Sequence, residues 1–338
     1  MPAIERAFFM STRPESIRKV IVMQKQLLKL GHLATQENLE PLIQGLRDLL
    51  AKQAKAHKAK NKDTVRVLGS KPMLSEKQRE KLAKAIAQLS TSHRFHLGAW
   101  HVEGKKMLSF LKDREPRFTV FMEGNSKLPF YAFSALPIIT CIGFGACGKY
   151  CYSFKAWRYP SAFFRQLQNT LLILRDKETL AKKFNELPAN IDFRLYVDGD
   201  FDSIESMRFW FNQLELRPDI KAYGYSKSWP LFLSYNKTEK FPQNYLLNLS
   251  AGSRYNAEYL AAMEKLDCVR GEFVAFPVTT KEKDNRAKYR REVKQAAKNA
   301  GHKKVFVCPS KCGECVLGGI HACGSAKFKG ITVAIGLH

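Results

Sequence analysis

From Phe193 onward the chain alternates short apolar stretches with helical stretches, and this alternation constrains the fold more than any other feature. Strands separated by helices form parallel sheets, because each crossover returns the chain to the same end of the sheet. We therefore expect an α/β fold whose core is a partial or complete parallel β/α barrel. The pattern predicts strands at Phe193–Val197, Ile220–Tyr225, Tyr245–Leu249, Glu272–Pro277 and Lys304–Val307, and helices at Ile204–Leu214, Ala257–Lys265 and Arg286–Asn299.

The N-terminal part of the chain has a different pattern. Apolar residues recur at three- and four-residue steps from Glu15 to about Lys62, which predicts a helical hairpin, and a further helix is expected at Ser75–Leu89. After Pro116, the segment Arg117–Met122 has strand composition, and a helix is expected at Ala162–Arg175. We therefore expect two domains, a basic helical region at residues 1–115 and a β/α core at residues 116–338 that carries both cysteine groups.

Seven of the eight cysteines fall into two tight groups. Grouped cysteines indicate metal ligands in a reducing compartment, where structural disulfides are disfavoured. The later group has spacings of three, two and seven intervening residues, which supplies four thiolates for zinc or a 4Fe-4S cluster. Its members are Cys308, Cys312, Cys315 and Cys323. His321 could replace a thiolate in a zinc site, and the lone Cys268 is expected to be a core residue.

The earlier group, Cys141, Cys147 and Cys151, lies in a glycine-rich loop and offers only three ligands. Three ligands leave an open coordination position, where a catalytic cluster could bind a small molecule. We therefore favour one or two 4Fe-4S clusters over zinc. Spacing alone does not separate zinc from iron-sulfur, and a composite site made from both groups also remains open.

The charge of the chain favours a polyanionic partner. The formal net charge is +25, from 56 Lys and Arg against 31 Asp and Glu. Such a field attracts nucleic acid, and we expect DNA rather than RNA. The candidate nucleic-acid-binding residues lie in two basic runs: Lys55, Lys58, Lys60, Lys62 and Arg66, and then Arg290 and Arg291. No stretch approaches the roughly 20 apolar residues of a membrane span, so we expect a cytoplasmic protein with no membrane partner.

An acidic turn follows the strand predicted at Phe193–Val197. Asp198 and Asp200 stand at the strand end where parallel α/β folds place their sites, and Lys227 follows the next strand. We expect these three residues to be catalytic, and by their charge Asp198 and Asp200 could hold Mg²⁺ for phosphodiester cleavage. Asp202 or Ser203 is expected to cap the helix that begins near Ile204.

Several motifs resemble the phage and plasmid "gene product eighty-eight" family, over roughly residues 120–338. They are Gly124-Asn125-Ser126-Lys127-Leu128-Pro129, the cysteine loop ending in Cys151-Tyr152, the turn Gly199-Asp200-Phe201, the segment Tyr225-Ser226-Lys227-Ser228, and the closing cysteine group. This resemblance implies an origin in a mobile genetic element more than it implies an activity.

The same order of motifs is distantly similar to radical S-adenosylmethionine enzymes. That resemblance implies a partial β/α barrel with a three-cysteine 4Fe-4S cluster, S-adenosylmethionine near Asp200, and an auxiliary four-cysteine cluster. The cysteines of the first loop are separated by five and then three residues, whereas the family's loop has three and then two.

Two classes of function remain. One is a nucleic-acid-binding iron-sulfur protein that processes or modifies DNA or RNA. The other is a non-catalytic DNA-binding protein for replication or transfer with structural metal sites. A metal-dependent nuclease is a further alternative.

Overall fold

This computed structural model describes residues 43–45, 47, 48, 51, 97–124, 128–137, 140–149, 151, 153 and 159–337. The helices predicted at Ser75–Leu89 and over most of Glu15–Lys62 lie outside this range. The chain divides into two compact units, Met1–Phe118 with Ser153–Gln168, and Thr119–Tyr152 with Asn169–His338. The predicted domain boundary at residues 115 and 116 stays a prediction.

The described part of the first unit contains helix α5 (Leu97–Asp113) and the first half of helix α7 (Pro160–Arg175). Gln168 joins α7 to the segment after α5. Its side-chain oxygen accepts hydrogen bonds from the backbone N–H groups of Arg117 (2.7 Å) and Phe118 (3.0 Å), and its amide donates to the carbonyl of Phe118 (2.9 Å). The backbone groups of residues 117 and 118 thus form hydrogen bonds with a side chain rather than with a neighbouring strand.

The second unit is built on a seven-stranded sheet, counted over the described residues, in the order β1-β2-β3-β4-β5-β7-β6. Every neighbouring pair is parallel. The strands are β1 (Tyr131–Ala132), β2 (Asp192–Leu195), β3 (Lys221–Ser226), β4 (Tyr245–Ser250), β5 (Val269–Pro277), β6 (Val305–Val307) and β7 (Thr332–Leu337).

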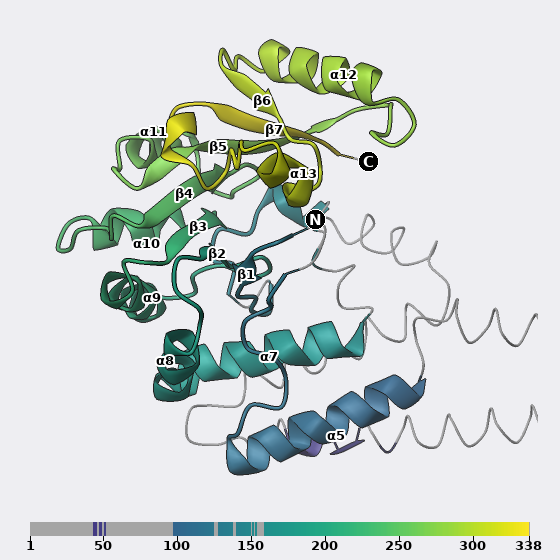
Figure 1. Cartoon of the computed structure of the whole chain (residues 1–338), viewed down its shortest axis with the longest axis vertical. Helices are drawn as coiled ribbons and strands as arrows, with labels where there is room; N and C mark the ends of the chain where they lie inside the picture. The colour runs from purple at the N-terminus through teal and green to yellow at the C-terminus, as the bar shows by residue number, and fades with distance from the viewer. Residues whose placement is uncertain are drawn as a thin grey trace, which may run out of the picture. The chain divides into compact units, whose positions relative to one another are not determined.

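Helices connect these strands. Figure 1 shows α8 to α11 in a row along one side of β2 to β5, whereas α13 stands outside this row. The helices of the second unit are α8 (Lys177–Asn185), α9 (Ile204–Leu216), α10 (Trp229–Tyr235), α11 (Ala257–Met263), α12 (Arg286–Asn299) and α13 (Cys312–Leu317), with short 3₁₀ helices η1 (Ala146–Lys149) and η2 (Ala326–Phe328).

Alternation along β2 and β3 shows how the two faces of the sheet are covered, since successive side chains of a strand point to opposite faces. Phe193 of β2 packs against Trp210 of α9, with ring centroids 6.3 Å apart. Arg194, the next residue, and Tyr223 and Tyr225 of β3 face the other way, where Tyr223 meets the ring of His321 at 5.0 Å. The C-terminal cysteine segment therefore lies across the face of the sheet opposite α9.

The prediction of an α/β fold with a parallel sheet is confirmed. The alternative of a complete barrel is wrong, because β1 and β6 end the sheet at two separate edges within the described residues. The strand predicted at Arg117–Met122 is also wrong: only Met122 makes a bridge, to Ala132. Its apolar residues serve the core instead, and Phe121 packs edge-on against Phe193 at 5.6 Å. Among the described helices, none combines the length and apolarity needed to cross a membrane.

Candidate metal centre and its surroundings

The carboxyl ends of the parallel strands bring several predicted site residues to one edge of the sheet. The first cysteine loop follows β1, Asp198 and Asp200 follow β2, Lys227 follows β3, and Arg254 follows β4. Ligand sites in parallel α/β proteins lie at this edge, because the loops there converge while the strand bodies are packed.

The first cysteine loop is held against the loop that follows β4. The backbone N–H of Cys147 donates to the carbonyl of Gly252 (3.1 Å), and the N–H of Arg254 donates to the carbonyl of Gly143 (3.1 Å). Phe144 and Ser253 form an antiparallel bridge. The loops after β1 and β4 are therefore joined by backbone hydrogen bonds around the first cysteine group.

Glycine permits this close contact. A Cβ atom on Gly143 would lie 1.8 Å from the carbonyl oxygen of Lys227, and one on Gly145 would lie 2.6 Å from the backbone nitrogen of Arg254. Any larger residue would push the cysteine loop away from the loops after β3 and β4. The glycines of this loop thus have a definite steric role.

Asp200 is buried at the centre of this edge, with 3% of its surface exposed. Its Oδ1 accepts from the N–H of Phe201 (2.8 Å) and the hydroxyl of Ser226 (2.7 Å), and its Oδ2 accepts from the N–H of Lys227 (2.7 Å). Its own N–H donates to the Thr140 hydroxyl (3.0 Å), directly before the cysteine loop. Burial raises the pKa of Asp200, while these three donors oppose the rise. The carboxylate of Asp200 thus joins the ends of β2 and β3, and its backbone N–H bonds to the start of the cysteine loop.

The other two predicted catalytic residues flank this network. Asp198 is buried, and its carbonyl accepts from the N–H of Ala135 (2.9 Å). The ammonium of Lys227 donates to the hydroxyl of Ser250 (2.7 Å), at the end of β4. Ser203 caps α9 in a capping box with Ser206, which confirms the predicted cap. The structure places all three predicted catalytic residues together, and their catalytic roles stay predictions.

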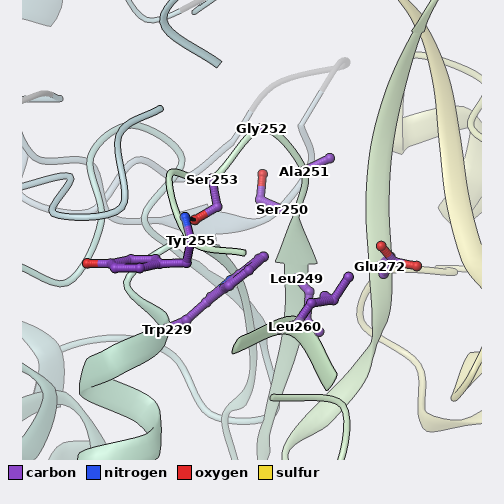
Figure 2. Close-up of a pocket in the computed structure, with 9 residues that line it drawn as sticks. All are labelled: Trp229, Leu249, Ser250, Ala251, Gly252, Ser253, Tyr255, Leu260 and Glu272. Carbon is purple, nitrogen blue, oxygen red and sulfur yellow. Dashed lines mark hydrogen bonds between the residues drawn. The ribbon is translucent and has the colours of Figure 1, made fainter. Parts of the chain in front are cut away.

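A small cavity adjoins the same edge (Figure 2). Its volume is about 180 Å³, and it lies between the loop after β4, the start of α10, α11 and β5. Trp229 and Tyr255 form aromatic walls, with centroids 6.3 Å apart and planes inclined by 36°. Gly252 and Ser253, which contact the cysteine loop, also line this cavity.

The four C-terminal cysteines approach one another on the face of the sheet. Cys308 directly follows β6, Cys312 and Cys315 lie in α13, and Cys323 follows a turn. Burial, together with the neighbouring thiols of Cys323, Cys312 and Cys315, raises the pKa of Cys308 to about 12. These four thiols are therefore near enough to influence one another electrostatically. Within the part of the chain that the structure describes, no group of three or more His, Cys, Asp or Glu side chains is placed so that it could hold a metal ion.

The surroundings of Cys323 fit an anionic metal-thiolate group. Arg270 of β5 is fully buried, and its guanidinium donates to Asn248 Oδ1 (2.7 Å) and to the carbonyls of Phe328 (3.1 Å), Ile331 and Glu272 (3.0 Å). All these acceptors are neutral, and no ion pair joins Arg270 to a carboxylate among the described residues. A buried cation without a counter-ion is strongly destabilising. Arg270 interacts electrostatically with Cys323, so thiolates in this site would supply the missing negative charge.

Neighbouring side chains extend this environment. The guanidinium of Arg194 lies 4.6 Å from the ring centroid of Tyr225. Burial raises the pKa of Cys323 to about 11, and hydrogen bonding by Tyr225 and the charges of Arg270 and Arg194 oppose the rise. The hydrogen bond from Tyr225 and the two positive charges favour a thiolate at Cys323, but burial outweighs them. The isolated Cys268 differs: it is buried and burial raises its thiol pKa, as expected for a core residue.

The predicted nucleic-acid-binding residues fall into two sets. Lys55, Lys58, Lys60, Lys62 and Arg66 lie outside the described residues. Arg290 and Arg291 lie on the exposed side of α12, whose buried side is formed by Tyr289, Val293 and Ala297. Lys294 and Lys298 are exposed on the same helix. None of these four cations forms an ion pair with a described carboxylate.

These features define an open parallel α/β protein that gathers one cysteine group at the carboxyl edge of its sheet and a second across one face. A model of the family described as Gene product 88 matches residues 73–329, which is more than half of the chain, so the chain belongs to this family. The family resemblance predicted from the sequence motifs is confirmed. No curated protein and no solved structure matches the chain.

The hydrogen bonds of Asp200 predict that Asp200→Asn is destabilising. The asparagine amide would point one N–H donor toward the backbone N–H of Lys227, leaving a buried donor unsatisfied at a cost of about 1–3 kcal/mol in the free energy of unfolding. Denaturant unfolding measures this loss. Asp176→Asn is the matched control, because Asp176 accepts a single N–H as the N-cap of α8 and asparagine caps equally well. Equal stability of the two variants would contradict the assigned role.

Arg270 has no carboxylate partner among the described residues. We therefore predict that Arg270→Gln lowers the metal content of the C-terminal site, whereas Arg270→Lys retains more of it because the positive charge remains. The measurement is metal stoichiometry per folded chain. Arg217→Gln is the control: its guanidinium also donates to backbone carbonyls, of Leu187 and Pro188 (both 3.1 Å), but it has a carboxylate partner in Asp219. We expect that control to lower stability and to leave metal content unchanged. The same metal content in all three variants would exclude a counter-ion role for Arg270.

Proposed function

We propose that this protein is a nucleic-acid-binding iron-sulfur protein of a mobile genetic element, acting in the cytoplasm, with a radical S-adenosylmethionine-like core that processes or modifies DNA or RNA. The observation that carries the proposal is the position of the first cysteine loop. It follows the first strand of an open parallel sheet and is bonded to the loop after β4, beside a small cavity.

The three cysteines of this loop suit a cluster with an open iron. Cys141, Cys147 and Cys151 are all half-buried, so a bound group would be shielded and still reachable. A 4Fe-4S cluster together with S-adenosylmethionine supplies radical chemistry when both are bound. The chain's own contribution is to hold the loop, through Gly143 and Asp200, and to provide a binding surface next to it.

The cavity beside Gly252 supports a small cofactor. At about 180 Å³ it is smaller than the roughly 300–1,000 Å³ pockets that enclose a whole drug-sized ligand, so it would hold one ring system of a larger molecule. Trp229 and Tyr255 offer aromatic faces to such a ring. Glu272 offers a carboxylate whose pKa burial raises, and this group could accept a hydrogen bond from a ring amino group. These features fit the adenine of S-adenosylmethionine.

The metal-dependent nuclease is the weaker alternative. Both oxygens of Asp200 already accept hydrogen bonds from protein donors, and Asp200 is almost fully buried. A carboxylate that ligates Mg²⁺ needs free lone pairs and space for the waters that this ion retains. A DNA-binding protein with structural metal sites remains the second candidate, and the clustering of Cys308 with Cys312, Cys315 and Cys323 favours at least one closed site.

The test of the metal assignment is anaerobic purification followed by iron, sulfide and zinc analysis. We expect iron and sulfide in the wild-type protein, and addition of S-adenosylmethionine should change the electron paramagnetic resonance spectrum of the reduced cluster. Cys147→Ser should remove this response with little loss of stability, because an open site contributes less to folding than a closed one. Cys312→Ser should unfold the C-terminal segment.

Cys268→Ala is the matched control for these cysteine variants, since Cys268 is buried alone in the core. It should keep the metal content and the spectrum of the wild type. A colourless wild-type protein with two zinc ions and no response to S-adenosylmethionine would contradict the radical proposal and favour the structural-metal candidate. Loss of one single cluster in both Cys147→Ser and Cys312→Ser would show a composite site.

Nucleic-acid binding is supported by the net charge of +25 and by the exposed cations of α12. Substituting Arg290, Arg291, Lys294 and Lys298 by alanine should flatten the slope of log affinity against log salt by about 0.9 for each phosphate of duplex DNA that the variant no longer neutralises. The charge-matched control substitutes Lys182, Lys183, Arg208 and Lys221, of which Lys183 and Arg208 pair with glutamates. If both variants change the slope equally, α12 is not the interface.

A further inference from the structure

The side chain of His321 is packed between aromatic rings and nearly buried, unlike that of an ordinary loop histidine. Its ring stacks on Phe130, with centroids 4.6 Å apart and planes inclined by 16°, and meets Tyr223 edge-on at 5.0 Å. Its side chain is only 18% exposed. Its backbone has a φ of +38°, which is uncommon for a residue other than glycine. The chain therefore holds this imidazole in one orientation at some conformational cost.

The two ring nitrogens of His321 have different surroundings. Nδ1 lies 3.4 Å from Oδ2 of Asp192, at the start of β2. Nε2 is buried, and the described residues offer it no hydrogen-bond partner. A buried nitrogen without a partner is costly, because it has lost its water and gained nothing in return. An acceptor nitrogen in this position requires a proton donor or a metal ion.

The residues around Nε2 favour a metal ion. His321 lies two residues before Cys323, and its own N–H donates to the carbonyl of Cys315 (3.4 Å). Tyr223, which the imidazole touches, also interacts electrostatically with Cys312 and Cys323. A Cβ atom on Gly324 would lie 2.4 Å from Nε2, so this nitrogen lies against the backbone that follows Cys323. The orphan nitrogen thus lies in the same region of the chain as the C-terminal thiols, beside the backbone that follows Cys323.

Asp192 is placed as a carboxylate that would hydrogen-bond to a metal-binding histidine without touching the metal itself. Histidines that bind metal through one ring nitrogen usually direct the other toward a carboxylate or carbonyl, which fixes the tautomer and the ring orientation. Asp192 occupies that place for Nδ1.

We propose that His321 binds a metal ion through Nε2, together with three of the four C-terminal cysteines, and that Asp192 orients its ring. This assignment rests on the proposed C-terminal metal site and makes it a Cys₃His centre, a ligand set of structural zinc. The iron-sulfur assignment then applies to the loop of Cys141, Cys147 and Cys151. Three thiolates still carry more negative charge than one divalent ion, so the site remains an anionic partner for Arg270.

The chain offers a matched control in His302. Its Nδ1 also lies 3.4 Å from a carboxylate oxygen, of Glu272, its side chain is 17% exposed, and its ring meets Phe276 edge-on at 5.9 Å. It differs from His321 in that no cysteine is among its near neighbours in sequence, its Nδ1 also lies 3.2 Å from the Thr332 hydroxyl, and its Nε2 is not an orphan among the described buried atoms. A general effect of losing a packed histidine would therefore appear in both positions.

The experiment measures Co²⁺ binding to the full chain after removal of its metal with a chelator, by absorbance and by competition with zinc. The variants are His321→Asn, His321→Cys, Asp192→Asn and His302→Asn. Asparagine is chosen because it tolerates the positive φ of residue 321. We expect Asp192→Asn to weaken binding by about 10- to 100-fold and His321→Asn by at least as much. His321→Cys should keep Co²⁺ and shift its ligand-field bands toward those of a four-thiolate site, and His302→Asn should match the wild type.

Two results would overturn the assignment in distinguishable ways. If the wild type binds Co²⁺ and His321→Asn binds it with the same affinity and spectrum, the metal site stands and the histidine ligand is refuted. If the wild type carries no metal at the C-terminal cysteines and binds no Co²⁺, the site itself is refuted. Should those cysteines instead hold an iron-sulfur cluster, nitrogen hyperfine coupling to the reduced cluster that disappears in His321→Asn supports the ligand, and its absence in the wild type refutes it.

Discussion

The buried charge of Arg270 is the interaction on which the C-terminal half of the second unit depends. Its guanidinium reaches from β5 to the carbonyls of Phe328 and Ile331 and, through Asn248, to the backbone of Cys323, whose carbonyl accepts from the Asn248 amide at 3.0 Å. One side chain therefore fixes the chain between Cys323 and β7 across the face of the sheet. Because its hydrogen-bond acceptors are all neutral, the fold leaves a cation to be balanced beside the thiols. The residue that attaches the cysteine segment would therefore also favour an anionic group in the proposed metal site.

At the carboxyl edge of the sheet, the buried residue Asp200 likewise holds separate chain segments together. The carboxylate of Asp200 accepts from donors at the ends of β2 and β3, and its backbone N–H donates to Thr140, so one residue holds three chain segments that are far apart in sequence. The parallel direction of all strands makes this possible, since only then do consecutive strand ends reach one edge. The glycines of the first cysteine loop then allow contact with the loops after β3 and β4 that no side chain would permit. These contacts fix the positions of the loops at this edge, where a bound cofactor would require well-defined loop positions.

Periodicity and burial predicted much of this fold from the sequence, since β2 to β6 and α9, α11 and α12 lie within a few residues of the predicted elements. The misses have physical reasons. Arg117–Met122 has strand composition, but its apolar residues pack into an aromatic core and its backbone bonds to Gln168. The predicted strand at Glu272–Pro277 omitted its first residues because Arg270 interrupts the apolar run, and this omission hid the most buried charge of the site. Likewise, nothing in the spacing of the cysteines reveals that Asp192, 129 positions before His321, meets its imidazole.

Whether the two cysteine groups share one site can be argued from their positions along β3. The first group is bonded to loops beyond the strand ends, near Lys227 and Gly252, whereas the second lies over the strand body, where Cys312 and Cys323 interact with Tyr223 and Cys323 bonds to Tyr225. Tyr223 and Tyr225 stand four and two residues before Lys227, which is about 13 Å and about 7 Å along an extended strand. Thiolates on one metal ion must all lie about 2.3 Å from it. A shared site would require Gly143 to leave Lys227 or Asn248 to leave Cys323, breaking the contacts that hold each segment. Two separate sites keep both sets of contacts, and this favours an open centre at the edge and a closed one on the face.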